Sequence, residues 1–191
     1  MKIARLLQLF FFLSIIIISS CSDNDEEFGD TSLISFEEAT FSEDEFIIYL
    51  TEDPNGKTFS FGAGTYNFTN TIPLADIENL TIKGAGIDET YFDFSNSAST
   101  SGEGIAAMDC SNLLFCGFTI QNTNGGNAIT ARNITGLRID GVGTVWPESS
   151  PDNGAYGIYP VESDDVIVEN CYAQAAVDAG IYSGQIGRAH V

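Results

Sequence analysis

Between residues 79 and 182 the sequence repeats a short apolar pattern at a nearly constant spacing. Each repeat contains a six-residue segment in which apolar residues alternate with polar ones, and the segment ends in Gly or Asn, which tolerate a left-handed backbone. These segments are 79–84, 112–117, 136–141 and 165–170. A second series, displaced from the first, pairs a small residue with Ile at 104–105, 128–129, 157–158 and 180–181.

Both series share a period of about two dozen residues, which is typical of a solenoid. Two or more short strands per period, with almost no helical pattern, predict an all-β solenoid of stacked coils. An antiparallel sandwich of short strands is the alternative. A sandwich gives no reason for two series in constant register, so the repeats favour the solenoid.

One coil cannot bury its own apolar face, so we expect equivalent residues of successive coils to stack as interior ladders. The first predicted ladder is Leu80, Leu113, Leu137 and Val166, and the second is Ile82, Phe115, Ile139 and Val168. We expect a left-handed turn at Gly84, Gly117, Gly141 and Asn170. Phe118, Val142 and Cys171 should point inward after it.

The segments 82–86, 153–161 and 178–182 resemble the right-handed parallel β-helix proteins of the pectin-lyase-like superfamily. Within it they are most similar to a bacterial group that is named for its right-handed β-helix repeats. The resemblance spans about residues 57–185 and implies a right-handed coil, as the usual handedness of parallel crossovers also does. It implies no settled biochemical activity.

The first 21 residues have the features of a bacterial lipoprotein signal. Lys2 and Arg5 precede an apolar stretch that is short for a membrane span, so we interpret 1–20 as a signal peptide. Cys21 follows Ile18-Ser19-Ser20, which matches a lipobox, so we expect the Cys21 thiol to carry the lipid. An ordinary signal peptide followed by a chance Cys is the alternative.

Residues 21–35 begin with an acidic run, and we predict that they form a flexible tether. The run resembles the export signal of Bacteroidetes-type lipoproteins, which implies a lipid-anchored protein of the outer membrane, exposed at the cell surface. A plain charged linker is the alternative.

A short helical cap at 36–56 should cover the first coil, because an open solenoid end exposes apolar ladders and strand edges. Ser42 followed by three acidic residues predicts a helix N-terminus. The β-helix coils then occupy 57–185 and are expected to be incomplete. Residues 186–191 break the repeat and resemble the translation of a common sequencing adapter, so we expect a non-native tail there, with a genuine short tail as the alternative.

The chain has 27 acidic residues against 7 lysines and arginines, for a formal net charge of −20. This balance disfavours nucleic acid as a partner, because there is no basic footprint. An anionic polysaccharide would also be repelled unless cations bridged it.

Tyr159 and Tyr182 each follow an Ile of the second series, so alternation places their rings outside. Adjacent coils lie about 4.8 Å apart, so the rings should stack on the surface and suit the apolar face of a sugar. An aromatic ladder that only stabilises the coils is the alternative. The extended turn 143–155, which contains Trp146 and Asp152, could form one wall of a binding site, or it could be a tolerated insertion.

Clustered carboxylates could hydrolyse glycosides or bind calcium. The acids concerned are Asp152, Glu162, Asp164, Asp165 and Asp178, of which Asp164, Asp165 and Asp178 are the metal candidates. Solvated turn residues are the alternative, and no cofactor other than Ca²⁺ is suggested.

The leading interpretation is therefore a surface-anchored lipoprotein that binds a polysaccharide or another glycan and attaches to the membrane through its lipid. A polysaccharide lyase, epimerase or hydrolase of the same fold is one alternative, although the sequence shows no complete catalytic set. A structural or adhesive surface protein is the other.

Overall fold

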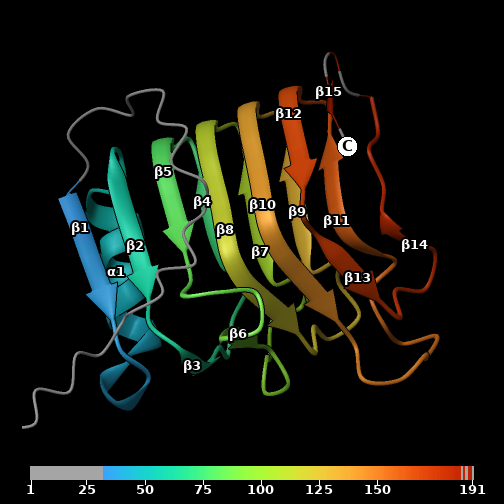
Figure 1. The fold of residues 1–191 in the computed structure, drawn as a ribbon, viewed down its shortest axis with the longest axis horizontal. Helices are drawn as coiled ribbons and strands as arrows, with labels where there is room; N and C mark the ends of the chain where they lie inside the picture. Colours follow the sequence, from blue (N-terminus) through green and yellow to red (C-terminus); the bar gives the residue numbers. More distant parts are fainter. Residues whose placement is uncertain (1–31, 186, 188, 191) are drawn as a thin grey trace, which may run out of the picture.

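The computed structural model describes residues 32–185, 187, 189 and 190. Its strands stack into a parallel β-solenoid (Figure 1), and every strand pairing among these residues is parallel. The front strands run down the view, the strands behind run back up, and the chain advances from left to right. The coil is therefore right-handed, as expected. The predicted signal peptide at 1–20, Cys21 and most of the predicted tether lie outside the described residues.

Two sheets form the walls of the solenoid. Sheet A contains, in order, β1 (Ser32–Phe36), β2 (Lys57–Phe61), β5 (Glu78–Lys83), β8 (Ser111–Gln121), β10 (Thr135–Val145), β12 (Asp164–Glu169) and β15 (Ala189–His190). Three shorter strands extend it: β3 (Gly64–Asn67), β6 (Thr90–Asp93) and β13 (Tyr172–Gln174). Sheet B contains β4 (Ile72–Ala75), β7 (Ile105–Met108), β9 (Ile129–Arg132), β11 (Tyr156–Val161) and β14 (Ala179–Ile181).

The interior ladders predicted from the sequence are confirmed. Leu80, Leu113, Leu137 and Val166 are partners across β5, β8, β10 and β12, and Ile82, Phe115, Ile139 and Val168 form the next row. All eight side chains are buried. In sheet B the ladder of Ile105, Ile129, Ile158 and Ile181 is also in register, and Ile72 extends it by one coil.

The turn at the end of each sequence segment is a bend inside a strand. Gly117 and Gly141 have φ of 69° and 62°, and β8 and β10 continue through them. Asn170 has φ 54°, but Gly84 does not adopt this conformation. Gly84 is instead required by space, because an added Cβ would collide with the carbonyl oxygen of Gly117. Beyond the bend, Phe118 and Val142 are fully buried as expected, and Cys171 packs against the core.

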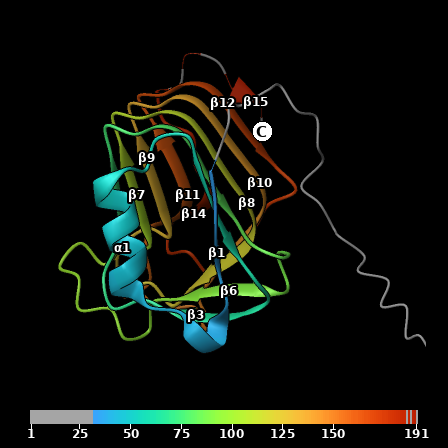
Figure 2. The same ribbon diagram turned by 90° about the vertical axis from the view of Figure 1, so that its left-hand side faces the viewer.

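A helical cap covers the N-terminal end of the solenoid, on the side of sheet B (Figure 2). Helix α1 (Glu43–Glu52) begins as predicted at Ser42, whose side chain accepts a hydrogen bond from the Glu45 amide. Phe46 and Leu50 are its buried residues, and Phe46 contacts the rings of Phe36 and Phe59 at 5.5 and 5.4 Å. A 3-10 turn, η1 (Glu38–Thr40), links β1 to this helix.

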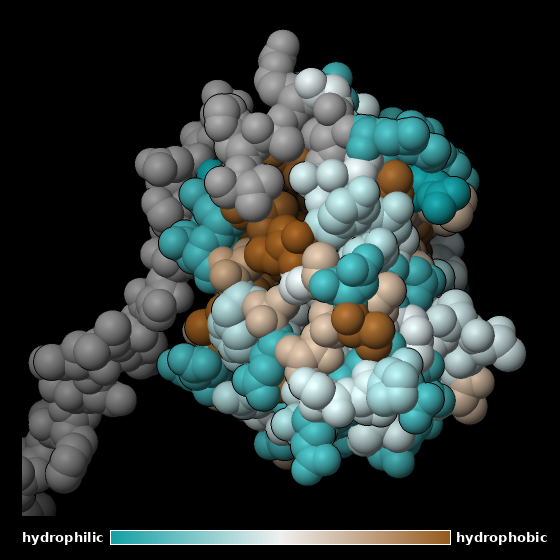
Figure 3. All heavy atoms as spheres, turned by 90° about the vertical axis from the view of Figure 1, so that its right-hand side faces the viewer, coloured by the Kyte–Doolittle hydropathy of each residue, from teal (hydrophilic) through white to brown (hydrophobic). Residues whose placement is uncertain are grey.

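One of the predicted boundaries is wrong, and one expected break in the repeat is not complete. Residues 32–35 do not belong to a flexible tether, because they form most of β1, which pairs with β2 over five residues. The segment 186–191 does not break the repeat throughout, because Ala189 and His190 pair with Val166 and Ile167 of β12. Figure 3 shows this end of the molecule, where apolar atoms lie between polar ones. Tyr172 and Val177, which lie between β12 and β14 in the sequence, are large apolar residues exposed to solvent.

Asp140 lies on the outer face of sheet A but is shielded from solvent. Its side chain is only 10% exposed. Arg138 donates a hydrogen bond to it at 3.2 Å, and the Asn170 amide donates another at 2.8 Å. Arg138 also pairs with Glu169 at 2.7 Å. The outer face of sheet A at this point is therefore an ion-pair network.

Candidate functional site

Three tyrosines meet on the outer face of sheet B, near its C-terminal end. Tyr156 and Tyr159 belong to β11, and Tyr182 directly follows β14. The ring centroids of Tyr156 and Tyr182 are 5.0 Å apart with an interplanar angle of 17°, and those of Tyr159 and Tyr182 are 5.7 Å apart at 29°. Tyr156 and Tyr159 lie 4.7 Å apart at 37°. We call these three residues the tyrosine cluster.

The sequence accounts for the positions of Tyr159 and Tyr182. Each follows an inward-pointing Ile of the ladder, so strand alternation turns its ring outward. Tyr182 is 46% exposed and Tyr159 is half-buried. The predicted surface pair is therefore confirmed as a structural feature, and its role remains a prediction.

Tyr156 was missed because it breaks the alternation. It lies two residues before the inward Ile158, a spacing that would ordinarily place it inside the solenoid. It is the first residue of β11, and it is half-buried at the surface. The strand register, which pairs Tyr156 with Ala179, brings it beside the coil that carries Tyr182.

Polar groups border the tyrosine cluster on the side where β9 and β11 begin. The side-chain oxygen of Asn127 accepts a hydrogen bond from the Tyr156 amide at 3.0 Å, and its Nδ2 donates to the Thr130 hydroxyl at 3.2 Å. Thr130 in turn donates to the Glu103 carboxylate. The result is a chain of amide, hydroxyl and carboxylate groups beside an aromatic surface.

Asp178 is the one predicted acid that the structure joins to the tyrosines. Its carboxylate lies near the Tyr156 hydroxyl, and their interaction is the main reason that the pKa of Tyr156 is raised. Partial burial and the negative charge of Asp178 act in the same direction. Tyr156 therefore stays protonated at neutral pH and serves as a hydrogen-bond donor.

Two other predicted residues are placed away from the cluster. Trp146 is 3% exposed and packs in the core, where its indole N–H donates to the Thr123 carbonyl at 3.0 Å. It therefore presents no ring to a surface ligand. Asp152 is exposed in the loop after Trp146, where its amide bonds to the Ser150 hydroxyl at 3.2 Å. That loop and residues 175–177 border a hollow of about 330 Å³.

The three metal candidates do not form one group. Asp164 and Asp165 are the first residues of β12 in sheet A. Asp178 directly precedes β14 in sheet B. Among the described residues, no three His, Cys, Asp or Glu side chains lie close enough to hold a metal ion. The calcium hypothesis therefore has no assembled site in this part of the chain.

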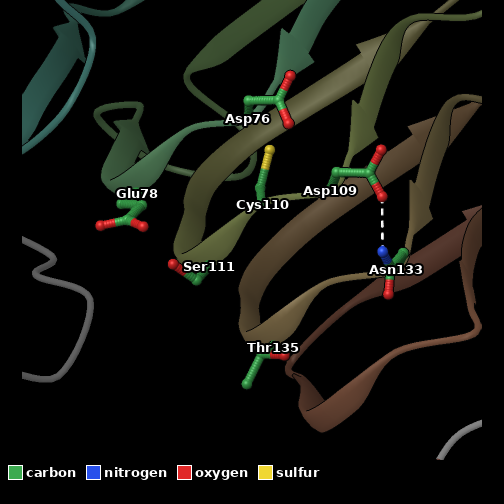
Figure 4. A pocket seen from close by; sticks show the side chains of 7 residues that line it. All are labelled: Asp76, Glu78, Asp109, Cys110, Ser111, Asn133 and Thr135. Carbon is green, nitrogen blue, oxygen red and sulfur yellow. Dashed lines mark hydrogen bonds between the residues drawn. The ribbon is translucent and has the colours of Figure 1, made fainter.

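A second hollow of about 330 Å³ lies at the corner between the end of sheet B and the start of sheet A (Figure 4). Its lining residues are Asp76, Glu78, Asp109, Cys110, Ser111, Asn133 and Thr135. Asn133 donates to Asp109 at 2.6 Å, and both residues have a left-handed backbone. Burial raises the pKa of the Cys110 thiol, and Cys110 donates to the Met108 carbonyl, so it is neither a thiolate nor unpaired.

The largest of the described hollows, about 490 Å³, lies between α1 and the start of sheet B. It is lined by Glu43, Asp44, Ile47, Ile48, Asn70, Thr71 and Pro73. Ile48 is 51% exposed, so this hollow has an apolar side that no described residue covers.

No family model, no curated protein and no solved structure matches this chain. The fold and the geometry of its surfaces are therefore the basis for any functional assignment. None of the helices in the described part of the chain is both long enough and apolar enough to cross a membrane.

Proposed function

We propose that this protein binds carbohydrate through the tyrosine cluster on the outer face of sheet B. The observation that carries the proposal is the close packing of three tyrosine rings at a partly exposed surface. The C–H groups on one face of a pyranose ring are apolar and pack well against an aromatic ring. A sugar ring can pack on the part of the cluster that remains open to solvent, where Tyr182 is 46% exposed.

The polar surroundings of the cluster support the same function. Specific small-molecule sites combine apolar walls with a few polar groups that fix the ligand's orientation. Here Thr130 pairs with Tyr159 in the neighbouring strand and is hydrogen-bonded to Asn127 and Glu103, and Asp178 lies near the Tyr156 hydroxyl. Carboxylate, amide and hydroxyl groups can each bond to sugar hydroxyls.

Binding without catalysis is our preferred form of the proposal. A general base for β-elimination must be deprotonated near the working pH, but the nearby Asp178 carboxylate raises the pKa of Tyr156. Arg138 is occupied by Asp140 and Glu169 on sheet A. Arg132, which is exposed at the end of β9, is the residue that would favour a polysaccharide lyase as a second candidate.

We further propose that the protein is a lipoprotein anchored to the outer membrane at Cys21 and exposed at the cell surface. The lipobox before Cys21 and the acidic run after it support this, and both lie outside the described residues. Cys21→Ala should abolish lipid labelling and release the protein from membranes, and a labelled, membrane-bound variant would refute the anchor.

Binding can be tested by affinity electrophoresis of the mature chain in gels that contain single polysaccharides. We expect at least one polysaccharide to retard the protein, and we expect Tyr159→Ala together with Tyr182→Ala to abolish the retardation. Tyr172→Ala is the matched control, because Tyr172 is an exposed tyrosine of sheet A. Equal retardation of the double variant and the wild type would refute the proposal, as would a panel without any retardation.

A further inference from the structure

A row of outward-facing residues connects the tyrosine cluster to the hollow beside α1. Pro73 of β4 pairs with Ala106 of β7, Ala106 pairs with Thr130 of β9, and Thr130 pairs with Tyr159 of β11. Tyr159 then stacks on Tyr182. We call these five residues the outer strip. With a coil spacing of about 4.8 Å, the outer strip extends over about 19 Å along the solenoid axis.

The outer strip has short side chains in its middle, tyrosine rings at one end and a hollow at the other. Ala106 and Thr130 are short, half-buried side chains. At one end stand the tyrosine rings, and at the other Pro73 borders the hollow that Ile47 and Ile48 line. Pro73 belongs to both features, so the apolar side of the hollow is continuous with the outer strip.

Polar groups follow one side of the outer strip along its length. The Thr71 hydroxyl lies within 2.8 Å of the Glu103 carbonyl, and the Glu103 carboxylate accepts from Thr130. Asn127 links Thr130 to the start of β11. A ligand that lay on the outer strip would meet donors and acceptors at successive coils, not only beside the tyrosines.

We infer that the ligand is an uncharged linear polysaccharide that lies along the solenoid axis, from the tyrosine cluster to the hollow beside α1. This inference rests on the proposed function. A pyranose unit in an extended β-linked chain is about as long as the coil spacing, so each coil can face one sugar. A ligand that used the tyrosine cluster alone would leave the rest of the strip empty.

The charges around the outer strip favour a neutral chain. Glu43 and Asp44 line the hollow, Glu103 borders the middle, and Asp178 borders the tyrosine cluster. Of the lysines and arginines in the described residues, Arg132 is the one that belongs to a strand of sheet B. A chain of uronic acids would place its carboxylates against these acids at unfavourable energy.

The test is a calorimetric titration of the mature chain with β-1,4-linked neutral oligosaccharides of two to six sugars, taken from whichever polysaccharide retards the protein. Affinity should rise at least tenfold from the disaccharide to the pentasaccharide. Ala106→Trp should remove most of that gain and leave the disaccharide affinity unchanged. Ile48→Ala should reduce only the affinity for the longest chains, by a few-fold. Asn67→Trp, at an exposed position of β3, is the matched control.

Three results would overturn the inference. One is an affinity that is constant beyond the disaccharide, and another is an Ala106→Trp variant that binds the pentasaccharide as the wild type does. The third is tighter binding of oligogalacturonate, with or without added Ca²⁺, than of any neutral chain. Each of these leaves the proposed function standing as long as the tyrosine double variant fails to bind, so the two failures are distinguishable.

Discussion

Ile139 is a core position at which a polar side chain should be poorly tolerated. It is fully buried and pairs with Phe115 and Val168 of the neighbouring coils. Ile139→Asp would place a carboxyl group there with no designed partner. We expect a loss of at least about 3 kcal/mol in the free energy of unfolding. Ile139→Val should cost only about 1 kcal/mol. Urea unfolding of both variants measures the difference, and equal stabilities would contradict the register.

Asp93 should make stability depend on pH. Burial raises the pKa of its carboxyl group, but hydrogen bonds from Ser95, Gln121 and Asn122 outweigh burial and leave the pKa lowered. The Gln121 and Asn122 amides donate to it at 2.6 and 3.1 Å. A lowered folded-state pKa contributes stability that is complete above the unfolded pKa of about 3.9 and is lost as the pH falls through the folded value.

The expected result is that Asp93→Asn is less stable than the wild type at neutral pH, and that the difference narrows as the medium is acidified below about pH 4. Denaturant unfolding at a series of pH values measures it. A difference that stayed constant down to about pH 2 would show that Asp93 carries no such linkage.

At the level of elements, one carboxylate adds polar contacts between α1 and the first coil to the packing of Phe46 and Leu50. Glu43 accepts hydrogen bonds from the Thr69 amide at 2.9 Å, the Thr69 hydroxyl at 2.6 Å and the Asn70 amide at 2.9 Å. Glu43→Ala should therefore cost about 1–2 kcal/mol. Asp44→Ala, an exposed neighbour in the same turn, should change stability by less than about 0.5 kcal/mol. Thermal melts that rank these variants in the opposite order would contradict this attachment of α1.

The elements also show what the sequence could and could not predict. The ladders and the start of α1 at Ser42 were predictable, because alternation and capping are local patterns. Strand β1 was missed, since Ser32–Phe36 follows an acidic run and its partner β2 lies more than twenty residues away. The continuation of β8 and β10 past their glycines was missed as well, because glycine usually ends a strand and here only bends it.

At the level of the whole molecule, the stacking of coils aligns equivalent residues of successive repeats on one surface. The sequence predicted that Tyr159 and Tyr182 would stack, but not that Tyr156 would join them or that Trp146 would be buried. The position of Tyr156 and the burial of Trp146 depend on how individual loops pack against the coils. The repeat period does not determine that packing. The hollow beside α1 likewise depends on how the cap packs against β4.

The central claim is that the outer face of sheet B is the carbohydrate-binding surface. The most direct measurement is a crystal structure of the mature chain with the tightest-binding neutral oligosaccharide. We predict a sugar ring packed on Tyr159 and Tyr182, with the chain directed along the outer strip over Ala106 towards Pro73. Sugar density on sheet A, in the hollow at Asp76 and Asp109, or in the loop after Trp146, with the tyrosine cluster bare, would contradict the account.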